Sequence, residues 1–312
     1  MAMTRSTLAR SAAFASIAVA LLLVALKSWA SWRTGSTAML GSLADSALDL
    51  VASLATLVGV WFAAQPADRE HRFGHGKAEA LAAMVQVVLI TLSATAIIFR
   101  AAVRLVEGGE TTGAAEGIGV STIAILATFA LLAWQRMVIA RTGSVAIRAD
   151  HVHYQSDLLL NLAVIAALVL DQYAGFAQAD PLFGFAIGAW LLWGAWSAAS
   201  TAVDQLLDRE WPDEKREAFV AAAARHPELS NLHDLRTRTS GTQDFVQFHV
   251  DLPGTMTVEQ AHDVIERVEA DLCTRFPEME LLIHIDPEGH VDDPGNPLVE
   301  EDEFKRLAGE TP

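Results

Sequence analysis

The stretch GSLADSALDLVASLATLVGVWFAA, residues 41–64, decides how the rest of the chain is interpreted. It is apolar over a length that can cross a bilayer, because a membrane-spanning helix needs about 20 residues. Yet Asp45 and Asp49 lie in its first half, four residues apart and therefore on one face of a helix. Two adjacent carboxylates in a low dielectric repel each other unless a cation or a proton lies between them. The stretch therefore predicts a membrane helix with a face that holds a cation.

The composition of the whole chain also indicates a membrane protein. Of its 312 residues, 52% are hydrophobic, and the mean hydropathy is +0.30. Residues 1–207 hold 13 acidic and 12 basic side chains, whereas residues 208–312 hold 25 acidic and 10 basic ones. We therefore expect a nearly neutral membrane domain over 1–207, followed by an acidic part that attracts cations and repels nucleic acid. The single cysteine, Cys273, excludes an internal disulfide and a cysteine-rich zinc site.

Six segments are apolar over the length that a bilayer core requires of a helix. They cover residues 12–34, 38–64, 79–105, 117–140, 147–170 and 180–206. The first segment follows Arg5 and Arg10 and could instead be a cleaved signal peptide. Because similar segments recur downstream, we interpret it as the first of six transmembrane helices.

An even number of spans returns the chain to its starting side, so both termini share one compartment. Loops on the terminal side carry the basic residues Arg69, Arg72, Lys77, Arg136, Arg141 and Arg148. The opposite loops EGGETTGAAEG and DQYAGFAQAD contain no lysine or arginine, and Arg33, Arg100 and Arg104 do not reverse this difference. Since cytoplasmic loops are the basic ones, we expect a multi-pass protein of the inner membrane with both ends cytoplasmic.

The acidic part has the pattern of a small α+β domain over residues 208–287. Two strands, NLHDLRTRTSG and TQDFVQFHVDL, are joined at Ser240–Gly241, which is typical of a hairpin. A helix precedes them, and a second helix and the strand ELLIHID follow. The order α-β-β-α-β suits a small open sheet with its helices on one face. Residues 288–312, rich in proline, glycine and acid, are predicted to be a disordered tail.

The span at 147–170 offers a partner for the first acidic pair. It contains His153 and Asp157, also four residues apart, with Asp150 on nearly the same face. The two spans run in opposite directions, and a rise of 1.5 Å per residue brings both pairs to similar depth. Asp45, Asp49, His153 and Asp157 together suit a four-coordinate zinc ion. Hydrogen bonds between helices, or a proton relay without metal, are the alternatives.

Two further groups carry metal-ligand residues. Asp68, His71 and His75 have D-x2-H-x3-H spacing in a loop, which suits a metal and would equally suit a solvated loop. The acidic domain holds the candidate ligands His233, His249, His262, His284 and Asp286. On the predicted strands, His249, His284 and Asp286 point away from the apolar alternation, as ligands would. We therefore predict metal binding by this domain.

The segments DSALD, QPADREHRFGHGKAEALAA, HYQSD and HDLRTRTSG together resemble the cation diffusion facilitator family, specifically its bacterial zinc-transporting members. The resemblance extends from the first span to about residue 287. It implies a homodimer of six-helix units, each with a cytoplasmic ferredoxin-like domain. It also implies metal–proton antiport by alternating access.

Residue by residue, the resemblance assigns three metal sites and one dimer contact. Asp45, Asp49, His153 and Asp157 match the transport site; Asp68, His71 and His75 match a loop site; and His233, His249, His262, His284 and Asp286 match a binuclear cytoplasmic site. Lys77 and Asp208 resemble a pair that interlocks the dimer. Ile285 departs from the glutamine of similar members and cannot ligate, so one cytoplasmic coordination position is open.

We therefore expect a secondary transporter that exports Zn²⁺ across the cytoplasmic membrane in exchange for protons. Its partners would be metal ions, protons, the lipid bilayer and a second copy of the chain, with no nucleic acid. Cd²⁺, Fe²⁺ and Mn²⁺ are alternative cargoes. A membrane metal-dependent hydrolase is a rival, but the chain lacks the motif H-E-x-x-H. A metal receptor without transport is another.

Overall fold

The chain divides into two units, Met1–Asp204 and Gln205–Pro312, and each is described by itself. The structure is a computed structural model, and it describes residues 4–34, 37–107, 118–174, 178–289 and 302–309.

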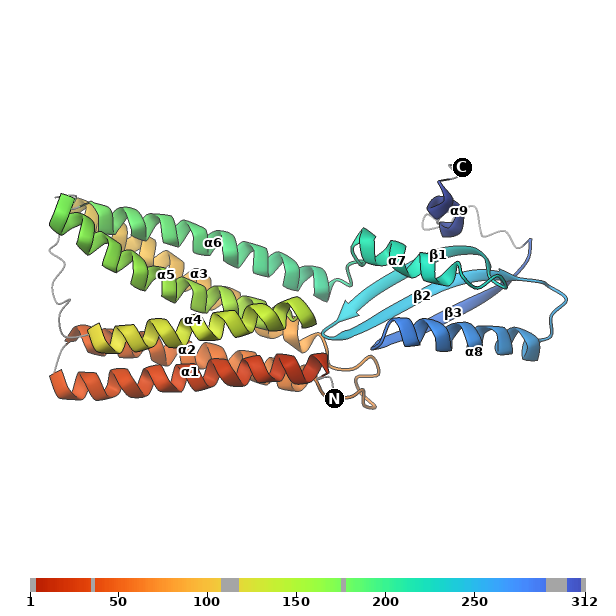
Figure 1. Ribbon diagram of the computed structural model, residues 1–312, viewed down its shortest axis with the longest axis horizontal. Helices are drawn as coiled ribbons and strands as arrows, with labels where there is room; N and C mark the ends of the chain where they lie inside the picture. The colour runs from red at the N-terminus through yellow and green to blue at the C-terminus, as the bar shows by residue number, and fades with distance from the viewer. Residues whose placement is uncertain (1–3, 35–36, 108–117, 175–177, 290–301, 310–312) are drawn as a thin grey trace. The chain divides into compact units, whose positions relative to one another are not determined.

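The first unit is a bundle of long helices that run side by side (Figure 1). They are α1 (Arg5–Thr34), α2 (Thr37–Ala63), α3 (Ala78–Glu107), α4 (Ile118–Thr142), α5 (Val145–Ala174) and α6 (Ala179–Leu206). Each predicted apolar segment falls on one of them. Helix α1 begins at Arg5, seven residues before the predicted apolar segment 12–34, because the more polar residues at Arg5–Arg10 are also helical.

Within the described residues, α1, α2, α3, α4 and α6 are long and apolar enough to cross a membrane. The remaining helix, α5, has 30 residues, which is ample length, but its first half is more polar. Arg148, Asp150, His153 and Asp157 all lie in that half. Helix α5 is therefore the element whose polar side chains must find partners inside the bundle.

Small residues bring α2 and α3 close together. A Cβ placed on Gly59 of α2 would lie 2.3 Å from the Ala82 Cβ of α3 and 3.2 Å from the Ala78 carbonyl oxygen. Val60 and Ala82 belong to one buried apolar cluster that also includes residues of α1, α4 and α5. Because apolar side chains gain nothing by leaving lipid for protein, such close backbone packing is a main source of helix association in a membrane.

The second unit is an α+β domain, as the sequence predicted. It contains α7 (Asp213–Ala223), β1 (Ser230–Ser240), β2 (Gln243–Leu252), α8 (Val258–Arg275), β3 (Met279–Pro287) and α9 (Glu303–Ala308). The strand order is β1-β2-β3, with β1 and β2 antiparallel and β2 and β3 parallel. The hairpin turn is at Gly241 and Thr242, one residue later than expected, and Gly241 has the positive φ of 62° that a tight turn favours.

One face of this sheet forms the core of the second unit. Val246, Phe248 and Val250 of β2 are buried together with Phe219 of α7 and Leu272 of α8. Both helices therefore cover the same face, as the strand alternation predicted. Helix α8 begins with a capping box in which Thr257 and Gln260 satisfy each other's backbone N–H groups. The opposite face of the sheet is left for polar side chains.

The end of the chain differs from the prediction of a disordered tail over 288–312. Residues 290–301 and 310–312 lie outside the described residues, but Asp302–Gly309 are ordered around the short helix α9. Asp302 caps this helix by accepting from the Phe304 N–H, and the buried Glu303 pairs with Arg216 of α7. Composition indicated disorder because it carries no information about the one buried ion pair, between Glu303 and Arg216, that holds this segment.

We predict that Gly59→Val destabilises the first unit. The added side chain meets the Ala82 Cβ, which is fixed to its backbone, so α2 and α3 must separate at a cost of about 1–3 kcal/mol. Thermal unfolding of the purified protein should show a lower midpoint. Gly194→Ala is the matched control, because its Cβ would meet only the Val152 Cγ1, at 3.0 Å, and that side chain can turn away. Equal stability of the two variants would contradict the close α2–α3 approach.

Candidate metal sites

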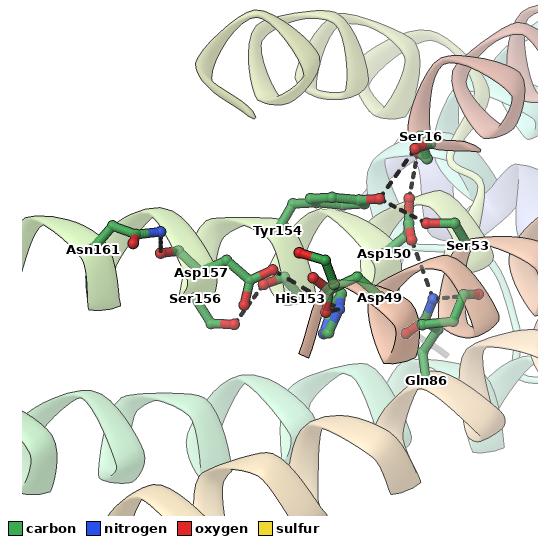
Figure 2. A network of polar contacts seen from close by, with 12 residues as sticks. Ser16, Asp49, Ser53, Gln86, Asp150, His153, Tyr154, Ser156, Asp157 and Asn161 are labelled. Carbon is green, nitrogen blue, oxygen red and sulfur yellow. Dashed lines mark hydrogen bonds and ion pairs between the residues drawn. The ribbon is translucent and has the colours of Figure 1, made fainter. Parts of the chain in front are cut away.

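A cluster of three ionisable side chains lies inside the first unit, where α2 faces α5 (Figure 2). The His153 Nε2 lies 3.0 Å from the Asp49 Oδ1 and 4.0 Å from the Asp157 Oδ2. His153 and Asp49 are largely buried, with side chains 8% and 13% exposed, and Asp157 is 32% exposed. We call Asp49, His153 and Asp157 the membrane cluster.

The membrane cluster has the composition and spacing of a metal site. One ligand atom from each residue lies within 4.8 Å of the others. Ligand atoms about 2.0–2.2 Å from one zinc ion must be this close to one another. Asp45, one turn before Asp49, is exposed and is outside the three-residue cluster, but it lines the same cavity of about 880 Å³. The structure thus brings three of the four predicted residues together and places the fourth in their cavity.

The loop between α2 and α3 brings together Asp68, His71 and His75, which we call the loop cluster. The Asp68 carboxylate lies 3.3 Å from the His71 Nδ1 and 3.4 Å from the His75 Nε2. The backbone N–H groups of His71 and, less strongly, of Glu70 donate to Asp68 and lower its pKa, although desolvation opposes them. Asp68 is therefore held in the ionised form that a metal ligand requires. Among the described residues, the Nδ1 of buried His75 has no hydrogen-bond partner.

The third cluster lies on the polar face of the sheet. Strand register aligns His233 of β1 with His249 of β2, and His249 with His284 of β3. The Asp286 carboxylate lies 2.9 Å from the His249 Nδ1, 3.5 Å from the His284 Nε2 and 3.7 Å from the His233 Nε2. We call these four residues the sheet cluster.

A hydrogen bond fixes how His233 is presented to the sheet cluster. Its Nδ1 lies 2.7 Å from the Asn231 carbonyl oxygen, which can only accept, so Nδ1 carries the proton. The neutral ring therefore offers the lone pair of Nε2 to a ligand, and Nε2 is the nitrogen that faces Asp286. This arrangement suits a borderline cation such as zinc.

One predicted ligand of the second unit, His262, lies outside the sheet cluster. His262 lies exposed on α8 and is in none of the three groups that the described residues form. Lys77 and Asp208 belong to different units, so their pairing stays a prediction. Asp208 does lie 3.4 Å from Arg238 within its own unit. Ile285 is half-exposed beside the sheet cluster and offers no ligand atom.

Sequence reasoning missed Asp234, whose carboxylate lies 3.7 Å from the His249 Nε2. In a regular strand, Asp234 would point to the face opposite His233. The pairing of β1 with β2 is irregular between His233 and Arg236, and Asp234 has a positive φ of 48°. This irregularity turns Asp234 toward the histidine face. An alternation pattern cannot reveal such a bulge.

Two family descriptions match nearly the whole chain. Residues 13–207 match the cation efflux transmembrane domain, and residues 211–288 match the cytoplasmic domain of cation efflux proteins. The cation-efflux pump FieF of Cronobacter sakazakii is 42% identical over 276 residues, which cover 88% of this chain and 92% of that protein. FieF of Salmonella arizonae is 42% identical over 287 residues, which cover 92% of this chain and 95% of that protein.

Two solved structures are similar in sequence to about a quarter of the chain. The metal-bound C-terminal domain of the CzcD transporter from Thermotoga maritima is 28% identical, and covers 25% of this chain and 93% of its own, with a TM-score of 0.25. The zinc form of a putative zinc transporter, CzrB, is 35% identical, and the match covers 28% of this chain and 99% of that structure, with a TM-score of 0.24.

We predict that His249→Ala lowers the number of zinc ions bound by the purified full-length protein. His249 lies between His233, His284 and Asp286, so its loss opens the centre of the sheet cluster. Equilibrium dialysis followed by elemental analysis measures the stoichiometry. His226→Ala is the matched control, since His226 pairs with Asp271 outside the cluster. If both variants bind as much zinc as the unchanged protein, the sheet cluster is not a metal site.

Proposed function

Because this chain belongs to the cation efflux family, we propose that it exports a divalent metal ion, Zn²⁺ above all, across the cytoplasmic membrane in exchange for protons. The chain is a multi-pass membrane transporter and not an enzyme. The cargo, the coupling to protons and the orientation in the membrane are the parts that we propose.

The observation that carries the proposal is the membrane cluster. Two carboxylates and an imidazole from α2 and α5 converge within 4.8 Å of one another, in a unit where α2 and four other described helices are long and apolar enough to cross a membrane. Ionisable groups at such a depth are costly to bury and in general mark the pathway of an ion or a proton. The cavity that holds them also holds Asp45, which can add the fourth ligand.

The chemistry of the membrane cluster favours zinc over harder ions. Imidazole suits Zn²⁺, whereas a site made only of carboxylates suits ions such as Mn²⁺ and Mg²⁺. Cd²⁺, Fe²⁺ and Mn²⁺ are the alternative cargoes, and a comparison of fluxes decides among them.

Proton exchange follows from the same ligands. A carboxylate or an imidazole must be free of its proton to bind a metal, so metal arrival displaces protons and proton arrival helps to expel the metal. An inward proton gradient can therefore drive the metal outward. The basic loops on the terminal side support an inner-membrane protein with both ends of the chain in the cytoplasm.

The loop cluster and the sheet cluster are proposed as accessory metal sites. The sheet cluster lies in the part of the chain that carries 25 acidic and 10 basic residues, so a bound divalent ion relieves local repulsion. We propose that the chain works as a homodimer in which Lys77 and Asp208 interlock, and that metal bound at the sheet cluster tightens this dimer.

We predict that Asp157→Ala abolishes zinc flux in proteoliposomes under an imposed pH gradient, while the protein stays folded. Loss of Asp157 opens the shell around His153, from which it lies 4.0 Å. Asn161→Ala is the matched control one turn further along α5, where the Asn161 side chain donates only to the Asp157 carbonyl. Zinc flux in Asp157→Ala close to that of the control would refute the transport site. Flux of the unchanged protein that does not respond to the pH gradient would refute proton coupling alone.

We predict that His153→Asp weakens discrimination against Mn²⁺. The change replaces the only nitrogen ligand of the membrane cluster with a third carboxylate oxygen, and a harder shell suits a harder ion. The ratio of Mn²⁺ to Zn²⁺ flux in competition should rise even where total activity falls. An unchanged ratio would mean that His153 does not set the choice of metal.

A further inference from the structure

A second buried carboxylate lies beside the membrane cluster without belonging to it. Asp150 of α5 has no exposed surface, and it lies three residues before His153, on the adjacent turn of the same helix (Figure 2). Side chains at this spacing have Cβ atoms about 5–6 Å apart. The position is therefore close enough to act electrostatically on an ion held by His153.

Three neutral side chains from three other helices donate hydrogen bonds to Asp150. The Ser16 Oγ of α1 lies 2.6 Å from the Oδ2, and the Gln135 Nε2 of α4 lies 2.8 Å from the same oxygen. The Gln86 Nε2 of α3 lies 3.1 Å from the Oδ1. Both carboxylate oxygens therefore accept from protein donors, and Asp150 is not among the residues whose ligand atoms meet within 4.8 Å in the membrane cluster.

A backbone carbonyl fixes the orientation of the Gln86 amide. The Gln86 Nε2 also lies 2.9 Å from the Ala52 carbonyl oxygen, which can only accept. The Gln135 Oε1 faces the His151 Nδ1 at 3.1 Å, which leaves the Gln135 Nε2 for Asp150. Asp150 is thus surrounded by N–H and O–H donors, and these hydrogen bonds offset part of the cost of burying an ionised carboxylate.

We propose that Asp150 is an affinity-setting residue: a fixed negative charge outside the coordination shell that strengthens binding of a divalent cation at the membrane cluster. The inference rests on the proposed function, since it concerns the same site. A divalent ion feels a unit charge twice as strongly as a monovalent ion does. At about 10 Å and an effective dielectric constant of about 20, this attraction changes the affinity by more than about tenfold.

The competing explanation is that Asp150 only ties α1, α3 and α4 to α5. The two explanations differ in whether the negative charge of Asp150 is needed. Holding the helices together requires only hydrogen bonds, whereas strengthening cation binding requires the ionised carboxylate. Asparagine has nearly the size of aspartate, and its amide oxygen can keep accepting from Ser16 and Gln135, so that only the Gln86 donor is left facing the new amide nitrogen. Asp150→Asn therefore removes the charge with little change in packing.

The test is zinc calorimetry on the full-length protein in which His71→Ala and His249→Ala have removed the other two clusters. We expect Asp150→Asn to bind zinc at least about tenfold more weakly than this background. Tyr154→Phe is the matched control. It breaks the neighbouring buried hydrogen bonds to Ser53 and to the Ser16 carbonyl but changes no charge, so its affinity should stay near that of the background.

A charge swap keeps the proposal testable if Asp150→Asn does not fold. Asp150→Ser combined with Ser16→Asp moves the carboxylate to the other end of the same 2.6 Å hydrogen bond. We expect this double variant to recover zinc affinity relative to Asp150→Ser alone. Unchanged affinity in folded Asp150→Asn, or no recovery in the swap, would overturn the proposal and leave Asp150 as a tie between helices. A background protein that binds no zinc would instead refute the membrane cluster as a metal site.

Discussion

A charge inside a membrane must find a counter-charge or hydrogen-bond partners within the protein, and the arrangement of the first unit depends on this constraint. The contact between the His153 Nε2 and the Asp49 Oδ1 meets it across α5 and α2. The Lys27 Nζ meets it across α1 and α2, where it lies 2.6 Å from the Ser46 Oγ. The Asp150 carboxylate meets it through donors from three further helices. Each of these polar groups thus links two or more helices specifically. Helix α5 carries two of them, His153 and Asp150, and through them contacts α1, α2, α3 and α4.

The three clusters use the same ligand chemistry but obtain it from different local structures. In the membrane cluster, the helical repeat places His153 and Asp157 on one face, and packing of α2 against α5 supplies Asp49. In the loop cluster, a turn folds back so that backbone N–H groups hold the Asp68 carboxylate between two imidazoles. In the sheet cluster, strand register aligns three histidines, and the neighbouring Asp286 faces all of them. The clusters also differ in exposure, because His153 and Asp49 of the membrane cluster are largely buried whereas Asp68 and His71 of the loop cluster are half-exposed.

The second unit separates its candidate metal ligands from its apolar core. Its apolar core lies on one face of the sheet, under α7 and α8, and the histidines lie on the other face. Changes to the ligands therefore leave the core packing in place, which makes the sheet cluster suitable for mutation without loss of the fold. The bulge near Asp234 adds a carboxylate to the histidine face without disturbing the buried residues of β2. The short helix α9 is attached to α7 by the ion pair between Glu303 and Arg216, and neither residue belongs to the sheet cluster.

The sequence by itself determined the elements and the residues that face each other along one of them. Apolar length predicted the membrane helices, alternation predicted the strands and their polar face, and i,i+4 spacing paired Asp45 with Asp49 and His153 with Asp157, because these periods follow from backbone geometry alone. Only the tertiary structure decided which partners meet. It brought Asp49 to His153 and left Asp45 at the cavity wall, enclosed Asp150 among three neutral donors, turned Asp234 toward His249 through a bulge, and ordered α9 through one buried ion pair. These outcomes depend on helix packing, on strand irregularity and on contacts between residues far apart in the chain, and no local repeat in the sequence encodes them.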